Sequence, residues 1–152
     1  MPTTTGRPAT EIADFIGGFV AAEGTFVARP WDGQFAFAVA LGATDRESVE
    51  MLHRFFRCGR VTWRERRQAH FDDEVTFVVR KLRDLVEVVV PFMDEHLHGS
   101  YKRQQYLAWR AELLEYWEHG VRRRRPCTVE GCRVIQRAKG LCRHHYYERF
   151  GR

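Results

Sequence analysis

IGGFVAAEG, spanning Ile16 to Gly24, places two adjacent glycines inside a segment whose apolar residues recur at helical spacing. A glycine in the interior of a helix costs about 1 kcal/mol relative to alanine. The stretch nevertheless gathers four small residues: Gly17, Gly18, Ala21 and Ala22. Because small residues let two helix backbones approach closely, the stretch predicts a contact with a second helix.

The chain contains no repeat of this stretch that could supply the second helix. We therefore expect the same helix of another subunit to be the partner, which makes the protein a homodimer with these four small residues at its interface. A two-fold axis would bring Glu23, near the end of the stretch, beside its symmetry mate. Two adjacent carboxylates repel each other unless they are protonated or bridged by cations, which predicts a divalent metal site.

Hydrophobic periodicity around the stretch predicts helices that alternate with hairpins. The expected order is a helix over 10–24, strands over 25–30 and 34–41, a helix over 45–56, strands over 59–66 and 70–80, a helix over 81–96 with a break near Pro91, and a helix over 101–120. This order predicts an α+β fold, an α-β-β-α-β-β-α unit whose four-stranded antiparallel sheet is covered by helices on one face.

The motif and its surroundings resemble a known family. IGGFVAAEG resembles the LAGLIDADG motif of homing endonucleases, in the variant that ends in Glu. The segment 81–109 is similar to the family's later helix, with its PF break at Pro91 and Phe92 and a lysine further on, Lys102. The resemblance covers about residues 10–117 and includes the order of helices and strands.

This resemblance implies a function as well as a fold. It implies that the motif helices form the dimer interface and that Glu23, helped by the backbone carbonyl of Ala22, binds Mg²⁺ at the scissile phosphates. Lys102 would stabilise negative charge on the phosphate. The sheets would form a saddle along the major groove of double-stranded DNA. A chain with one motif would cleave near-palindromic sites as a homodimer.

Strand alternation divides the sheet into two faces. Ten residues are expected to face the helices: Phe26, Phe35, Phe37, Val39, Val61, Trp63, Phe71, Val75, Phe77 and Val79. The opposite face carries the residues that we expect to contact DNA: Thr25, Arg29, Gln34, Arg60, Thr62, Arg64, Arg66, His70, Thr76 and Arg80. The same polar face would also suit a sheet that is simply solvated.

The end of the chain predicts a separate zinc site. Three cysteines and a histidine follow the pattern Cys127-x4-Cys132-x9-Cys142-x2-His145. This spacing suits tetrahedral zinc, whose binding energy replaces a hydrophobic core too small to form here. The adjacent His144 could be the ligand instead. GLCRHHY resembles the ending of small Cys3His modules of phage and bacterial DNA-binding proteins, which favours His145.

The net charge of +5 is concentrated in this tail. Residues 121–152 carry ten Lys or Arg and two acidic residues, whereas residues 1–120 carry fifteen against eighteen. The basic residues expected to contact DNA are Arg122, Arg123, Arg124, Arg125, Arg133, Arg137, Lys139 and Arg143. The expected organisation is a flexible N-terminus (1–9), an endonuclease domain (10–119), a basic linker (120–126) and a zinc module (127–152).

Composition also indicates a compartment. No apolar run is long enough to span a bilayer, and residues 1–10 contain no apolar signal segment. We therefore expect a cytoplasmic protein without a membrane partner, associated with the nucleoid of a bacterial or phage-infected cell. In a reducing compartment cysteines serve as ligands rather than as disulfides. The remaining cysteine, Cys58, is expected to be a buried small hydrophobe.

Ala21 and the second strand depart from the family pattern, and these departures leave other functions possible. Ala21 replaces the earlier Asp of the motif, at a position that is usually structural. The second strand, which in the family often offers glutamine or lysine toward the active site, carries mostly alanine. One alternative is a catalytically silent relative that only binds DNA or RNA, as a repressor or a maturase. Another is a zinc-stapled protein-interaction module, which the arginine-rich tail argues against.

Overall fold

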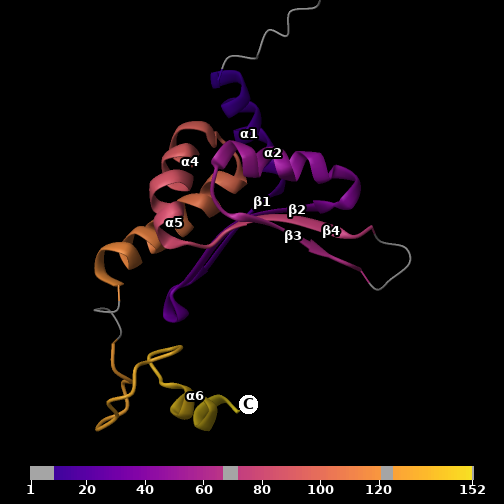
Figure 1. Cartoon of the computed structure of the whole chain (residues 1–152). Helices are drawn as coiled ribbons and strands as arrows, with labels where there is room; N and C mark the ends of the chain where they lie inside the picture. Colours follow the sequence, from indigo (N-terminus) through magenta and orange to yellow (C-terminus); the bar gives the residue numbers. More distant parts are fainter. Residues whose placement is uncertain (1–8, 67–71, 121–124, 152) are drawn as a thin grey trace, which may run out of the picture.

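The computed structural model describes residues 9–66, 72–120 and 125–151 (Figure 1). Its sheet has four antiparallel strands in the order β1-β2-β4-β3, with β1 at Gly24–Arg29, β2 at Gln34–Gly42, β3 at Arg60–Arg64 and β4 at Glu74–Val79. The helices α1 (Ala9–Glu23), α2 (Arg46–Phe56), α4 (Val90–His96) and α5 (Tyr101–His119) lie on one side of this sheet. The expected element order and the α+β fold class are confirmed.

One face of the sheet forms the core, as the alternation of apolar residues predicts. Six of the expected residues are buried against the helices: Phe35, Phe37, Val39, Val75, Phe77 and Val79. Ile16 and Val20 of α1 and Leu52 of α2 pack onto them. Phe26 and Val61 are partly buried at the edges of this core, and Phe71 lies outside the described residues. In the described part of the chain, no helix covers the second face of the sheet (Figure 1).

Trp63 departs from this pattern, because 52% of its surface is exposed although it shares the helix-facing phase of β3. β3 is an edge strand, so Trp63 has a neighbouring strand on one side only. The Trp63 Nε1–H donates to Asp73 at 3.2 Å, and the Arg46 guanidinium lies 5.7 Å from the ring centroid. Trp63 therefore makes these two polar contacts in place of the core contact that the alternation predicts.

Helix α1 differs from expectation in which face it buries. Ile12 and Phe15 share the helical spacing of the buried Ile16, but Ile12 is exposed and Phe15 has 50% of its surface accessible. Gly17 is instead the buried small residue, since a Cβ at this position would overlap the backbone carbonyl oxygen of His96 in α4. Gly17 thus makes a close approach to α4 of the same chain, and its expected contact with a second subunit stays a prediction.

The two glycines provide a matched test of this packing. We expect Gly17→Ala to destabilise the fold by about 3 kcal/mol, because the added methyl group must push α4 away from α1. Gly18→Ala meets no atom within 4 Å and should gain up to about 1 kcal/mol of helix propensity. Urea unfolding of both variants at equal, low protein concentration measures the difference. Equal free energies of unfolding would contradict the α1–α4 contact.

The segment from α3 to α4 stays helical through Pro91, so the break expected there is only a change of hydrogen-bond pattern from π to α. After α3 (Leu82–Asp84), a π-helical turn over Leu85–Val89 leads into α4, and Pro91 occupies the first turn of α4, where its missing N–H is least costly. The Tyr106 hydroxyl of α5 donates to Asp94 at 2.6 Å. Burial, aided by this hydrogen bond, raises the pKa of Tyr106 well above its ordinary value. Tyr106 therefore stays protonated and holds α5 against α4.

The end of the chain forms a small separate unit. Its helix α6 (Arg143–Phe150) follows two isolated β-bridges, Pro126 with Ile135 and Ala138 with Leu141. Its buried residues are Cys127, Leu141 and Cys142, with Tyr146 packed against them. This core is far too small to stabilise a fold alone, as expected for a metal-dependent unit. Within the described ranges, no helix is long and apolar enough to cross a membrane.

Candidate nucleic-acid interface and metal centres

Glu23 is the last residue of α1, and its side chain is exposed. The chain passes directly from Glu23 into β1 through Gly24, where a Cβ would lie 2.6 Å from the Val20 carbonyl oxygen. Only glycine allows this tight passage from helix to strand. Ala22, which is also exposed, belongs to the last turn of the helix, whose carbonyl groups lack intrahelical partners. Carboxylate and carbonyl oxygens are the ligands that Mg²⁺ prefers, so the donors fit this ion.

An exposed stripe runs along α1 toward Glu23. Phe15, Gly18 and Ala22 are exposed and follow one another at helical spacings of three and four residues. Phe19 stacks on Phe15 at a centroid distance of 6.3 Å. Ala21, which we expected at the interface, is half-buried and packs against the core of its own chain. Gly18 and Ala22 therefore remain interface candidates, whereas Phe15 was missed although its spacing from them could have shown it.

The face of the sheet away from the helices carries most of the predicted DNA-contacting residues. Thr25, Arg29, Gln34, Arg60, Arg64 and Arg80 are exposed, and Thr62 and Thr76 are half-buried in the middle of β3 and β4. Arg66 follows β3, and its Nη2 lies 2.7 Å from the Glu74 carboxylate. His70, Arg122, Arg123 and Arg124 lie outside the described residues. The structure thus places the strand residues on one face of the sheet, whereas Arg66 forms an ion pair with Glu74.

Lys102 lies in the first turn of α5 and is half-buried. Ser100 is the N-cap of α5, and its hydroxyl accepts from the backbone N–H of Arg103 at 3.4 Å. Helices α1 and α5 contact each other, so Glu23 and Lys102 belong to neighbouring helices. Among the residues that the structure describes, no acidic side chain is paired with Lys102, which leaves its ammonium available for a phosphate.

The cysteine and histidine side chains of the terminal unit converge. The ligand atoms of Cys127, Cys132, Cys142 and His145 all lie within 4.8 Å of one another. His145 Nδ1 is 3.3 Å from Cys127 Sγ and 3.2 Å from Cys142 Sγ, and Cys132 Sγ is 4.0 Å from Cys142 Sγ. Tetrahedral zinc with ordinary Zn–S and Zn–N bonds separates its ligand atoms by roughly 3.6–3.8 Å. The set therefore fits zinc.

The residues around this cluster indicate which side chains are free to bind a metal ion. His144 points away and is paired with Glu148, its Nε2 3.1 Å from the carboxylate. Burial raises the pKa of the Cys127 thiol, but hydrogen bonds from the backbone of Cys142 and Val129 and from His145 lower it to about 6. Burial raises the pKa of Cys58, which stays a thiol in the main core. The thiolate form that zinc requires is thus favoured at Cys127. At Cys132 the backbone hydrogen bond from Val134 lowers the pKa, but burial and the side chains of Cys142 and Cys127 raise it above its ordinary value.

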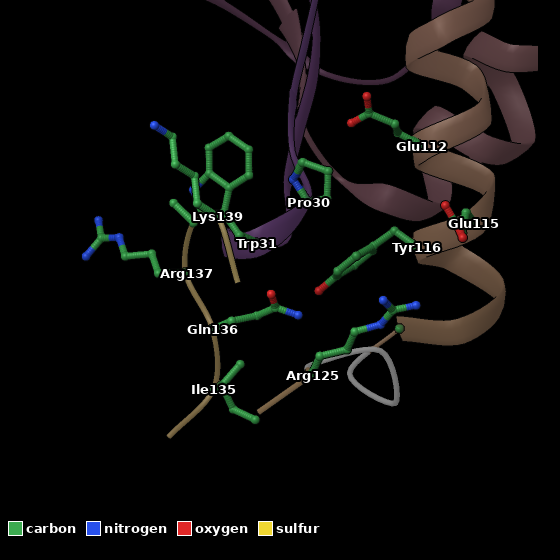
Figure 2. A pocket seen from close by; sticks show the side chains of 12 residues that line it. Pro30, Trp31, Glu112, Glu115, Tyr116, Arg125, Ile135, Gln136, Arg137 and Lys139 are labelled. Carbon is green, nitrogen blue, oxygen red and sulfur yellow. The ribbon is translucent and has the colours of Figure 1, made fainter. Parts of the chain in front are cut away.

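A cavity of about 490 Å³ lies between the turn that joins β1 to β2, the end of α5 and the terminal unit. Figure 2 shows Pro30 and Trp31 from the turn, Tyr116 from α5, and Arg137 and Lys139 from the terminal unit around it. The turn is separated from Glu23 by the whole length of β1, roughly 20 Å at the rise of an extended strand. The cavity is therefore distinct from the candidate metal site at Glu23.

A model of the family "LAGLIDADG endonuclease" matches residues 16–113, which is most of the chain. The chain belongs to the LAGLIDADG endonuclease family. The match includes α1 from Ile16 onward, all four strands and α5 up to Leu113. A search of curated proteins finds no match. The terminal unit lies outside the matched region, so its chemistry rests on its own geometry.

Solved structures agree with this assignment. The LAGLIDADG homing endonuclease I-GzeII in complex with its DNA target is 25% identical, with a TM-score of 0.58 over 70% of this chain and 38% of that one. I-LtrWI bound to target DNA is 17% identical, with a TM-score of 0.57 over 70% and 37%. The homing endonuclease I-TnaI is 26% identical, with a TM-score of 0.55 over 70% and 76%. The LAGLIDADG fold is thus shared, and this chain spans little more than a third of I-GzeII and I-LtrWI.

Proposed function

We propose that this LAGLIDADG endonuclease is a homodimer that cleaves both strands of a near-palindromic DNA site in a Mg²⁺-dependent reaction. The observation that carries the proposal is the exposed stripe of α1, which leads to the exposed carboxylate of Glu23 in a chain that holds one family unit. Two such stripes packed about a two-fold axis would place two Glu23 carboxylates side by side. DNA as the substrate would locate this activity in the cytoplasm, at the nucleoid.

Each part of the proposed site has one role. Glu23 and its symmetry mate would hold Mg²⁺ together with the carbonyl of Ala22. When bound, a divalent ion supplies an activated water and stabilises charge on the phosphate. Lys102 would add electrostatic stabilisation of the phosphate oxygens. The open face of the sheet would position the duplex, because its arginines and Gln34 can hydrogen-bond to phosphates and base edges.

The terminal unit would add contacts outside the sheet. Its zinc site would use Cys127, Cys132, Cys142 and His145. The described cationic residues of this unit are all exposed: Arg125, Arg133, Arg137, Lys139, Arg143 and Arg149. Exposed arginine and lysine side chains on a zinc-held unit suit contacts to phosphate, which strengthen binding without specifying sequence.

A direct test of the function starts from a random DNA pool. Sites selected by the full chain are placed on a plasmid, and the plasmid is incubated with protein and Mg²⁺. Linear product from both strands supports the endonuclease. Tight binding to a selected site without cleavage would instead favour the catalytically silent relative, and selection of RNA alone would favour a maturase.

The dimer is tested on the exposed stripe of α1. We expect Gly18→Leu to raise the dimer dissociation constant about tenfold or more, because the new side chain would separate the paired helices. Ala111→Leu, at an exposed position of α5, makes a comparable increase in size elsewhere and should leave the dimer unchanged. Light scattering over a dilution series measures both variants. A wild-type chain that is monomeric on its DNA site would rule out the paired carboxylates.

A further inference from the structure

The open face of the β1–β2 hairpin carries an apolar patch within a polar frame. Val27 has 38% of its surface exposed and lies directly opposite Ala36 in the β1–β2 register. Thr25 and Ala38 form the next pair along the hairpin on this face, and Ala40 follows on β2. None of these side chains is longer than valine, and only that of Thr25 can form a hydrogen bond.

The side chains that surround this patch are three arginines and one glutamine. Arg29 and Gln34 form the last pair of the β1–β2 ladder, beyond Val27 and Ala36. Arg60 lies across β4 from the hairpin, and Arg80 directly follows β4. All four of these side chains are exposed. An exposed apolar patch rimmed by polar residues is typical of an interaction surface, and this positive rim fits the phosphates of a nucleic acid better than it fits an apolar protein partner.

The backbone under the patch is held in place from the core side. The Trp109 indole Nε1–H donates to the Val27 carbonyl oxygen at 3.0 Å, and the Trp109 ring packs 5.0 Å from that of Phe26, the residue before Val27. Trp109 is itself buried. Val27 is therefore presented on a fixed strand, and its branched side chain has restricted rotation about χ1. A fixed apolar side chain can recognise a group of matching position at little entropic cost.

We propose that Val27, together with Ala36, reads the C5-methyl group of a thymine in each half of the DNA site. This inference rests on the proposed function, since it places the open face against the major groove. Thymine is the base that presents a methyl group there, and apolar side chains are its usual contact. The middle of the hairpin thus selects thymine by apolar contact, whereas Arg29 and Gln34 at its end select bases by hydrogen bonds.

The test removes one methyl group at a time. Starting from a site selected by the full chain, each thymine of a half-site is replaced by deoxyuridine, which keeps base pairing and loses only the methyl group. Binding constants are measured for the wild type, for Val27→Ala and for Arg29→Gln as a control on the same strand. Val27→Ala leaves the Trp109 hydrogen bond possible, because that bond uses the backbone.

The expected result is specific to one position. At the thymine that Val27 contacts, deoxyuridine should weaken wild-type binding about fourfold, the value of one buried methyl-sized group. The ratio should fall close to one in Val27→Ala and stay about fourfold in Arg29→Gln, whose overall binding is weaker. Equal ratios in the wild type and Val27→Ala at every thymine would overturn the inference while leaving the endonuclease intact. A chain that selects no DNA would overturn both.

Discussion

Glu23→Gln is expected to lower the rate of DNA cleavage about a thousandfold or more while binding to the selected site changes by less than about twofold. Glutamine has nearly the same shape as glutamate but no negative charge, so it is a poor ligand for Mg²⁺. Without this charge on both subunits of the proposed dimer, the site would not hold Mg²⁺, which would supply the activated water and stabilise the phosphate. A thousandfold loss corresponds to about 4 kcal/mol of transition-state stabilisation.

A second acid on the same helix supplies the control for this result. Glu11 is exposed in the first turn of α1, far from the end that carries Glu23. Glu11→Gln removes the same charge and should cleave at the wild-type rate. Single-turnover cleavage with protein in excess separates the chemical step from binding. If Glu23→Gln cleaved as fast as Glu11→Gln, the metal site would have to be sought elsewhere in the chain.

Removal of zinc is expected to unfold the terminal unit and to leave the sheet domain folded. The unit buries only three residues, Cys127, Leu141 and Cys142, and two of them are proposed ligands. Structural zinc sites contribute on the order of 10 kcal/mol to the folding of such units. We therefore expect Cys142→Ser to lose the proposed zinc ion and the ordered amide signals of residues 125–151. The strand signals of the main domain should persist.

Three further variants test which residues bind the proposed zinc ion. Cys58→Ser changes a cysteine in the main core and should keep one zinc ion per chain. His145→Ala should lose zinc, whereas His144→Ala should keep it, because His144 is paired with Glu148. Metal content by mass spectrometry and a chelator titration measure these outcomes. Zinc loss in His144→Ala and zinc retention in His145→Ala would reverse the assignment of the ligand.

Local patterns were sufficient for much of the fold. Period-two alternation in 34–41 identified Phe35, Phe37 and Val39 as core residues, because neighbouring side chains of a strand point to opposite faces whatever the fold. Pro91 marked the place where the helical hydrogen-bond pattern changes from π to α, since proline has no N–H to donate. The spacing of Cys127, Cys132, Cys142 and His145 likewise predicted a cluster that the structure brings together.

Helix α1 shows why local patterns do not predict which face of an element is buried. A helix has more than one face that carries apolar residues, and periodicity does not say which one meets the core. Ile12 and Phe15 share helical spacing with Ile16 but lie on the exposed side. Trp63 has the alternation of a core residue but lies on an edge strand, where neighbours are missing on one side. Both errors concern partners that are distant in the sequence.

The sequence by itself determined the chemistry of this protein: a helix that ends in Glu23, four strands with one apolar face, and a Cys3His cluster. It could do so because residue type and spacing along the chain are local properties. Only the tertiary structure showed that the two glycines of IGGFVAAEG have different surroundings. It places α4 against Gly17 and leaves Gly18 open. The packing of α4 on α1 leaves Gly18 exposed for the proposed partner helix. This packing cannot be predicted from the residues next to the glycines, because α4 is distant in the sequence.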